Sequence, residues 1–224
     1  MENMTYNMMY SGLRRQLRMF SILLLLAAIP GMAVADDSRD FFLTISRDDG
    51  YMLHKLLEHG IDPNLKEPTR GDTAMVLALH EHAMKAFAEL INAPKIDLEK
   101  RSDNGDTALM VASFTDNLPA VKALLDKDVE VNTHGWAALH YAAASGDCDI
   151  IKLLLEKSAY IDAESPNKTT PIMMAARAGH AEAVKLLVEA GADLHLKNDQ
   201  GLSAADFAAK SEHPEIAEVL HPKN

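Results

Sequence analysis

The chain repeats a pattern of apolar and polar positions with a period of about 33 residues. One leucine in each short apolar segment marks the period. These leucines stand at intervals of 34, 34, 30, 33 and 33 residues, and they are Leu56, Leu90, Leu124, Leu154, Leu187 and Leu220. The last five each follow a turn position by 19 residues, and the turn positions are Gly71, Gly105, Gly135, Lys168 and Gly201. A fixed period of this kind predicts stacked structural units.

Each unit contains the pattern of two short helices. In the fifth unit, Thr170 is suited to cap a helix that begins at Pro171, and a second helix is expected over 181–190. The second helix would carry its apolar side chains in one stripe, formed by Ala183, Val184, Leu187 and Val188. A single pair of helices cannot bury such a stripe, whereas a stack of pairs can.

The variation in length falls in the connections between units. A register mark follows each of the first five leucines by eight residues, at Asn64, Leu98, Asn132, Asp162 and His195. From mark to turn position the distances are 7, 7, 3, 6 and 6 residues, so the connection before Gly135 is the shortest. Directly after it comes Trp136, and then Ala137 in place of the capping Thr or Ser of other units, at a cost of about 1 kcal/mol. Lys168 occupies a usual glycine position, and a left-handed conformation there would cost roughly 1 to 2 kcal/mol.

The turn and first-helix segments resemble the ankyrin repeat family. Its motif G-x-T-P-L-H-x-A-A-x-x-G-H is echoed in GDTAMVLA, GDTALMVA, GWAALHYAAASG, TTPIMMAARAGH and GLSAADFA, and a divergent first unit keeps LLEHGIDPN. The resemblance implies an all-α ankyrin-repeat solenoid of about six stacked helix–turn–helix units, joined by hairpin-like fingers. The first helices and the fingers would form a concave face that binds partners. The units cover approximately 36–67, 68–101, 102–133, 134–164, 165–197 and 198–224.

The first 35 residues are typical of a cleavable export signal. A basic segment with Arg14, Arg15 and Arg18 precedes the apolar run FSILLLLAAI, and AVA precedes Asp36. We therefore expect a signal peptide over 1–35 with cleavage after Ala35, and an ankyrin repeat domain over 36–224. The apolar run is shorter than the roughly 20 residues of a membrane span, so none is expected after cleavage. RRQL is a poor twin-arginine motif, which favours general secretory export. With GWAALHYAAASGD and AYIDAESPNKTTPIMMAARAG, the whole resembles exported bacterial ankyrin proteins and implies the periplasm, or secretion as the alternative.

Net charge limits the classes of partner, and cysteine content limits how the fold can be stabilised. Residues 1–35 hold three Arg and one Glu, so the remainder has 19 basic and 32 acidic residues and a net charge of −13. This balance argues against nucleic acid and is compatible with a protein partner that carries a basic surface. Cys148 is the only cysteine, so the fold must be stabilised by packing without an intrachain disulfide. Asp147 and Asp149 flank it and disfavour its thiolate. A monomer is expected.

Motifs that carry chemistry are not found. The sequence has no G-x-S-x-G, P-loop or H-E-x-x-H, and no cysteine pair for zinc. The nearest approach to a metal cluster is His80-Glu81-His82, which the register places in the short turn between two helices, without an identifiable third ligand. We therefore expect no enzyme activity, no cofactor and no metal. His140 and His180 occupy family-pattern positions and are expected to make turn hydrogen bonds.

The register predicts where a binding face lies. One row of first-helix positions holds Leu77, Val111, Tyr141, Met174 and Phe207, and the row three residues further along holds His80, Phe114, Ala144, Arg177 and Lys210. Finger tips are expected at Arg70, Asp72, Asn104, Asp106, Trp136, Thr169 and Gln200. The candidate partner-binding residues are Trp136, Tyr141, Phe114, Arg177, Phe207 and Lys210, because exposed aromatic side chains on a rigid surface often anchor partners. In the alternative interpretation, Leu77, Val111 and Met174 are core, and Trp136 packs to compensate for its short finger.

The predicted function is a non-enzymatic protein–protein interaction module that is exported to the periplasm. It would bind another exported protein through its concave face and fingers, in an accessory, protective or inhibitory role. The sequence names no partner. A host-directed secreted ankyrin effector is one alternative. A metal-binding or enzymatic protein that uses His80, Glu81 and His82 is another.

Overall fold

The computed structural model describes residues 30–220, with side chains from residue 38 onward. The chain divides into two compact parts, residues 1–43 and 44–224. Helix α2, Pro30–Ser46, accounts for the described residues of the first part and continues across the boundary. Of the export signal predicted over 1–35, residues 1–29 lie outside the described residues. Its predicted cleavage position after Ala35 falls within α2.

The described residues are all-α, as predicted. They contain twelve helices, of which the last ten form five consecutive packed pairs, and one isolated antiparallel β-bridge between Lys66 and Thr73. After α2 the helices are α3 (Gly50–Glu58), α4 (Ala74–His80), α5 (Met84–Leu90), α6 (Ala108–Phe114), α7 (Leu118–Leu125), α8 (Ala138–Ser145), α9 (Cys148–Glu156), α10 (Pro171–Ala178), α11 (Ala181–Glu189), α12 (Ala204–Lys210) and α13 (Pro214–Leu220).

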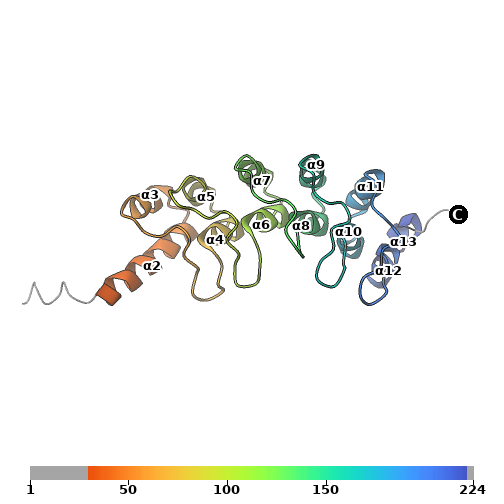
Figure 1. The fold of residues 1–224 in the computed structure, drawn as a ribbon, viewed down its shortest axis with the longest axis horizontal. Helices are drawn as coiled ribbons and strands as arrows, with labels where there is room; N and C mark the ends of the chain where they lie inside the picture. Colours follow the sequence, from red (N-terminus) through yellow and green to blue (C-terminus); the bar gives the residue numbers. More distant parts are fainter. Residues whose placement is uncertain (1–29, 221–224) are drawn as a thin grey trace, which may run out of the picture. The chain divides into compact units, whose positions relative to one another are not determined.

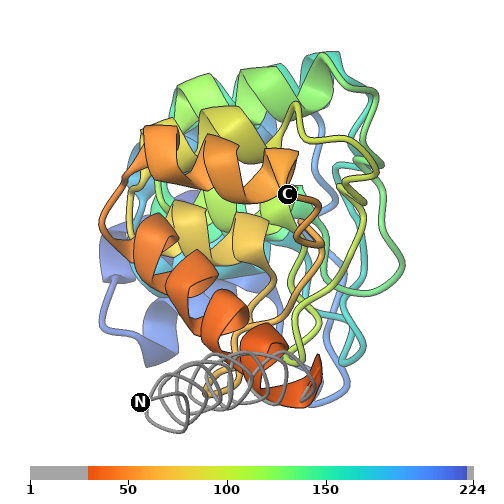
Figure 2. The same cartoon turned by 90° about the vertical axis from the view of Figure 1, so that its left-hand side faces the viewer.

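Within residues 44–224 the helices form two rows. The first-helix row consists of α4, α6, α8, α10 and α12, and each of these helices packs against the next. The second-helix row begins with α3 and α5 and continues with α7, α9 and α11 (Figure 1). The loops before α4, α6, α8, α10 and α12 project together on one side and are called the fingers here (Figure 2).

The marker leucines face the core, with one exception. Leu90, Leu124, Leu154, Leu187 and Leu220 are at most 1% exposed, whereas in α3 the fully buried residue is Leu53 and Leu56 is only half-buried. In α11 the predicted stripe is confirmed at Ala183, Val184 and Leu187, and Val188 is half-buried.

Polar register marks join consecutive units. The Asn64 amide donates to the Lys95 carbonyl (2.8 Å) and accepts from the Asp97 amide (2.7 Å). Asn132 makes the same pair of bonds with the Ser158 carbonyl and the Tyr160 amide, both at 2.8 Å. These side chains satisfy loop backbone groups of the next unit, which explains a polar residue at this position.

The first helices begin at the predicted caps. Thr73, Thr107 and Ser203 each accept a hydrogen bond from the amide three residues on, at 3.2–3.4 Å. Ala137 is the N-cap of α8 and makes no such bond, as predicted. Instead, its amide donates to Nδ1 of His140 at 3.1 Å, so a histidine in the first turn satisfies the capping residue. Lys168, at a usual glycine position, has the left-handed conformation whose cost was considered above, with φ of 58°.

Thr170 also stands at the predicted N-cap, but its hydroxyl is buried and has no hydrogen-bond partner. We expect Thr170→Val to leave the free energy of unfolding unchanged or to raise it by up to about 1 kcal/mol, because an unpaired polar group is removed. The matched change Thr107→Val should lower it by about 1 kcal/mol, because a working cap is lost. Urea unfolding of both variants tests this, and equal losses at the two positions would contradict it.

Candidate functional site

The two predicted rows on the first helices differ in exposure along the chain. Leu77 and Val111 are 3% and 1% exposed, so these two positions are core, as the alternative interpretation held. Their equivalents on α8, α10 and α12 are only half-buried, and they are Tyr141, Met174 and Phe207. In the adjoining row His80, Phe114, Arg177 and Lys210 are exposed. The binding face predicted from the register is therefore open to solvent mainly from α6 onward.

Three of the six candidate residues come together in an aromatic cluster of Phe114, Trp136 and Tyr141. The ring of Tyr141 lies edge-on to Phe114, with centroids 6.2 Å apart, and edge-on to Trp136, at 6.5 Å. Trp136 also meets the ring of the buried His140 edge-on at 5.2 Å. Edge-to-face packing of this kind is favourable for aromatic pairs and restrains each ring. The cluster brings together the end of α6, the first half of α8 and the finger that precedes α8.

Phe114 is the part of the cluster that faces solvent most. Its side chain is 52% exposed, whereas Trp136 and Tyr141 are half-buried. Trp136 is thus neither fully exposed nor buried between units, and it packs partly against α8. An exposed phenylalanine held by a second ring presents apolar area with little side-chain entropy left to lose on binding.

Tyr141 is fixed by the neighbouring finger. Its hydroxyl donates to Oδ1 of Asp106, and the Asn104 side-chain amide donates to the other carboxylate oxygen at 2.7 Å. Burial raises the pKa of the Tyr141 phenol, and the hydrogen bond and charge of Asp106 act in the same direction. The phenol therefore remains a neutral hydrogen-bond donor, and the ring is held at both ends.

The short finger before α8 closes in its own way. In the other four fingers a backbone amide donates to the carbonyl of the residue after the turn position, and these pairs are Glu67–Asp72, Ser102–Asp106, Ser165–Thr169 and Asn198–Leu202, at 2.7–3.0 Å. In the short finger the Thr133 hydroxyl donates to the Trp136 carbonyl instead, at 2.7 Å. The Thr133 hydroxyl thus takes the place of the backbone amide that closes the other fingers, and it fixes the position of Trp136 at the turn.

The short finger also interrupts the contacts between fingers. The Asp103 amide donates to the Gly71 carbonyl and the Asp199 amide to the Asn167 carbonyl, both at 3.1 Å. In the part of the chain that the structure describes, no such backbone bond joins the short finger to either neighbour. The shortening predicted from the register therefore leaves a local break in the row of fingers, beside Trp136.

The other three candidate residues lie outside the cluster. Arg177 is exposed on α10 and has no ion pair within residues 38–220. Phe207 is half-buried on α12, and Lys210 is exposed at the end of that helix. These three residues belong to the same two rows of first-helix positions, on α10 and α12.

Two predicted finger tips are wrong as surface positions. Asp72 is 4% exposed and its carboxylate lies 3.1 Å from the Arg70 guanidinium, while Thr169 is 2% exposed. Both follow a turn position, where the backbone already turns inward to start a helix. Sequence reasoning also missed Thr133 as a finger closure. The polar residue found shortly before the turn position in neighbouring units could have indicated it.

His80, Glu81 and His82 do not form a site. Glu81 lies 3.6 Å from the Arg70 guanidinium, and His82 has a left-handed backbone with φ of 52°. Residues 38–220 contain no group of three His, Cys, Asp or Glu side chains that could hold a metal ion. The thiol of Cys148 is half-buried, and burial, followed by the charges of Glu182, Asp147 and Asp149, raises its pKa.

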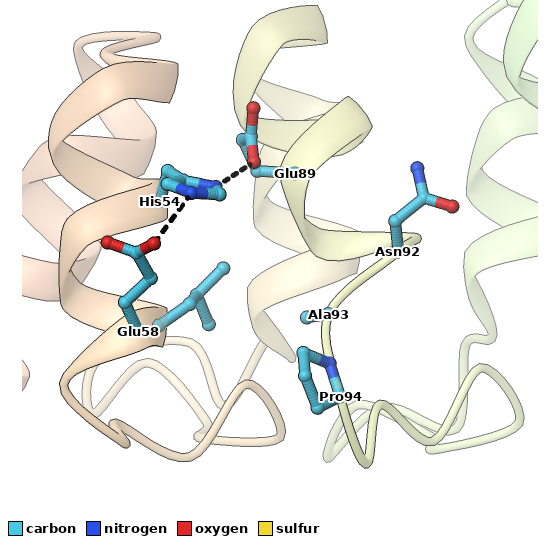
Figure 3. Close-up of a pocket in the computed structure, with 7 residues that line it drawn as sticks. His54, Glu58, Glu89, Asn92, Ala93 and Pro94 are labelled. Carbon is cyan, nitrogen blue, oxygen red and sulfur yellow. Dashed lines mark hydrogen bonds and ion pairs between the residues drawn. The ribbon is translucent and has the colours of Figure 1, made fainter.

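A pocket that sequence reasoning missed lies between α3 and α5 (Figure 3). It encloses about 240 Å³ and is lined by His54, Leu57, Glu58, Glu89, Asn92, Ala93 and Pro94. Both ring nitrogens of His54 face carboxylates at its rim, those of Glu58 and Glu89 (Figure 3). The spacing of His54 and Glu58 on one helix was visible in the sequence, but the approach of Glu89 depends on how the units stack.

Comparison with known proteins identifies the repeats. Residues 41–133, 83–165 and 139–224 match the family model described as "Ankyrin repeats (3 copies)". Neurogenic locus notch homolog protein 1 is 32% identical in Xenopus tropicalis and 30% in Homo sapiens, each over 124 residues, or 54% of this chain and 5% of the relative. Ankyrin repeat and SAM domain-containing protein 6 of Rattus norvegicus is 38% identical over 73 residues, 30% of this chain and 8% of the relative. This chain therefore spans less than a tenth of the length of these relatives.

Proposed function

Because the chain belongs to the ankyrin repeat family, we propose that it binds another protein through the aromatic cluster and the adjoining rows on α8, α10 and α12. Ankyrin repeats imply a protein–protein interaction module, and such domains are typically non-catalytic. The observation that carries the proposal is the exposed ring of Phe114, held by Tyr141 beside a break in the row of fingers.

The physical basis is a rigid apolar anchor within a polar surface. Tyr141 is held by Asp106 and by ring packing, and Trp136 by the Thr133 hydroxyl, which donates to its carbonyl. A partner side chain that covers Phe114 removes apolar area from water without having to order the receiving surface first. Arg177 and Lys210 provide charged groups at the edge of the same face, where they favour correct orientation more than affinity.

We further propose that the protein is exported and that its partner is another exported protein with a basic surface. The support is the basic, apolar and small-residue order of residues 1–35, together with the net charge of −13 beyond them. Within residues 30–220, no helix is both long and apolar enough to cross a membrane. The intact mass of protein recovered from the periplasm should correspond to a chain that begins at Asp36. Recovery of the uncleaved chain from the cytoplasm alone would contradict export.

The binding face is tested by crosslinking in cells. A photo-reactive phenylalanine analogue at position 114 should give a discrete covalent adduct with one protein, and the same analogue at Tyr160 should not. Tyr160 is a matched control because it is an aromatic residue, 67% exposed, in the loop after α9. Adducts of equal yield at both positions, or an adduct at 160 alone, would place the binding face elsewhere.

With that partner purified, Phe114→Ala and Trp136→Ala should each weaken binding by about tenfold or more, as expected for central aromatic anchors. Tyr160→Ala should change the dissociation constant by less than about twofold. Titration calorimetry gives these values directly. Unchanged affinity in both cluster variants would remove the aromatic cluster from the interface.

A further inference from the structure

His54 pairs with a carboxylate at each of its ring nitrogens, one on its own helix and one on the second helix of the next repeat. It lies on α3 with Nε2 3.2 Å from Oε1 of Glu58, one turn further along the same helix. Its Nδ1 lies 2.9 Å from Oε2 of Glu89 on α5 (Figure 3). No other side chain within residues 38–220 bridges α3 and α5 through an ion pair.

The arrangement fixes the protonation state of the ring. An ionised carboxylate only accepts hydrogen bonds, and a neutral imidazole carries a single N–H. A neutral His54 could therefore satisfy one carboxylate, while its other nitrogen would direct a lone pair at the second. Both contacts are favourable only for the imidazolium, which donates from both nitrogens. The two contacts are therefore those expected of the protonated ring.

The charged groups around the ring agree with this assignment. On α3, Lys55 donates to Glu58 at 2.8 Å and lowers the pKa of that carboxyl, so Glu58 stays ionised. On α5 the facing group is Glu89, and the Cβ and backbone carbonyl of Lys85 on that helix lie beside Gly50. Lys127 is directed to the side-chain oxygen of Asn92, at 3.0 Å. The hydrogen bond to Glu89 is the largest cause of a raised pKa at His54.

The pocket next to His54 increases the importance of the contact between His54 and Glu89 for holding α3 against α5. Leu57, Ala93 and Pro94 form its apolar wall, and a second cavity of about 370 Å³ shares Leu57 and Pro94 with it. Part of the boundary between α3 and α5 is thus unfilled by side chains, so packing holds the two helices together less completely there. At the other end of α3, Asp48 accepts from the Lys85 and Ala86 amides at 2.7 and 3.0 Å.

We infer that His54 is a pH-sensitive clasp between α3 and α5, closed when its ring is protonated and released when the ring loses its proton. Release leaves the hydrogen bonds of Asp48 before α3 and of Asn64 in the loop after it, and loosens the end of α3 that lines the pocket. Repeat proteins transmit such a change mainly to the nearest unit, so the effect is confined to the first units.

The direction of the pH dependence follows from the raised pKa. A group that binds its proton more tightly in the closed state contributes its stabilisation fully below its ordinary pKa of 6.5, and loses it as pH rises through the raised value. Opening of α3 should therefore increase with pH. His54 is about half exposed, so the change is of the size of a surface ion pair, about two- to fivefold in the opening equilibrium.

Amide hydrogen exchange of the full chain, corrected for intrinsic rates, tests the clasp between pH 5.5 and 8. As pH rises, amides of α3 should lose about two- to fivefold protection in the wild type. His54→Gln should remove this dependence and give low protection at every pH. His59→Gln is the matched control, an exposed histidine that follows α3, and should behave as the wild type.

Two results would overturn the clasp. One is wild-type protection in α3 that does not change with pH. The other is a pH dependence that persists in His54→Gln or disappears in His59→Gln. Glu89→Gln provides a second reading, because it keeps the side-chain size but removes the charge. It should lower the His54 pKa measured by NMR, and an unchanged pKa would contradict the contact across the units.

Discussion

Replacing His140 by Ala should lower the free energy of unfolding by about 3 kcal/mol. The ring is fully buried, and its Nδ1 accepts from the Ala137 amide while Nε2 donates to the Thr169 carbonyl at 3.0 Å. Removing the ring leaves the buried Ala137 amide without a partner, at about 1–3 kcal/mol before relaxation, takes one of two hydrogen bonds from the Thr169 carbonyl, and opens a cavity. Urea unfolding at pH 7.5 measures the loss.

His80→Ala is the control, because His80 is exposed and surface changes of this kind cost within about 0.5 kcal/mol. His140→Asn should recover part of the loss, since the Asn side-chain oxygen can take the place of Nδ1. If His140→Ala were no more harmful than His80→Ala, the two hydrogen bonds would have no role in stability.

His140 should make stability depend on pH in the direction opposite to that expected for His54. Burial lowers the pKa of His140, so its stabilising contribution is complete above its ordinary pKa of 6.5 and is lost as pH falls through the lowered value. Protonation would also set an N–H of the ring against the Ala137 amide. Acid should therefore destabilise the units around α8, while it tightens the contact between α3 and α5.

Replacing Gly146 by Ala should cost about 2–3 kcal/mol. Gly146 ends α8 with φ of 86°, a left-handed backbone that costs an ordinary residue about 1 kcal/mol or more. A Cβ there would lie 2.6 Å from atoms of the His180 ring. That ring is bonded through Nε2 to the Ala144 carbonyl at 3.0 Å, as expected for this position, so it would have to move and give up the bond.

Gly191→Ala separates the two causes. Gly191 has a comparable φ of 97°, but among the described residues no atom lies within 4 Å of the place that a Cβ would take. Only the backbone cost of about 1 kcal/mol therefore remains. Thermal unfolding of both variants gives the difference, which measures the contact between units. Equal losses would show that His180 moves aside freely.

Local patterns were enough to predict the two helices of each unit. Helix starts at Thr73, Thr107 and Ser203, and the left-handed Lys168, depend on a few neighbouring residues, so a correct register places them. The divergent first unit was less predictable, because Leu53 rather than Leu56 became the fully buried position. There the motif is weak, and the packing surface of α5 decides which leucine is covered.

The candidate site was only partly predictable. The register identified the row that holds Phe114 and Tyr141, since residues on one helix face follow from spacing alone. It could not show that Phe207, Arg177 and Lys210 would stay apart from the aromatic cluster. It also placed Asp72 and Thr169 at the surface, although the turn directs both inward.

By itself, the sequence determined the ankyrin repeat architecture, the phase of the units and the short finger before Trp136, because these depend on period and local propensity. Only the tertiary structure decided the contacts between residues about 30 to 35 positions apart. These are the bond from Tyr141 to Asp106, the bond from His140 to the Thr169 carbonyl, and the clasp from His54 to Glu89. Their physical origin is the stacking of one unit on the next, whose rise and rotation bring together side chains that no local pattern relates.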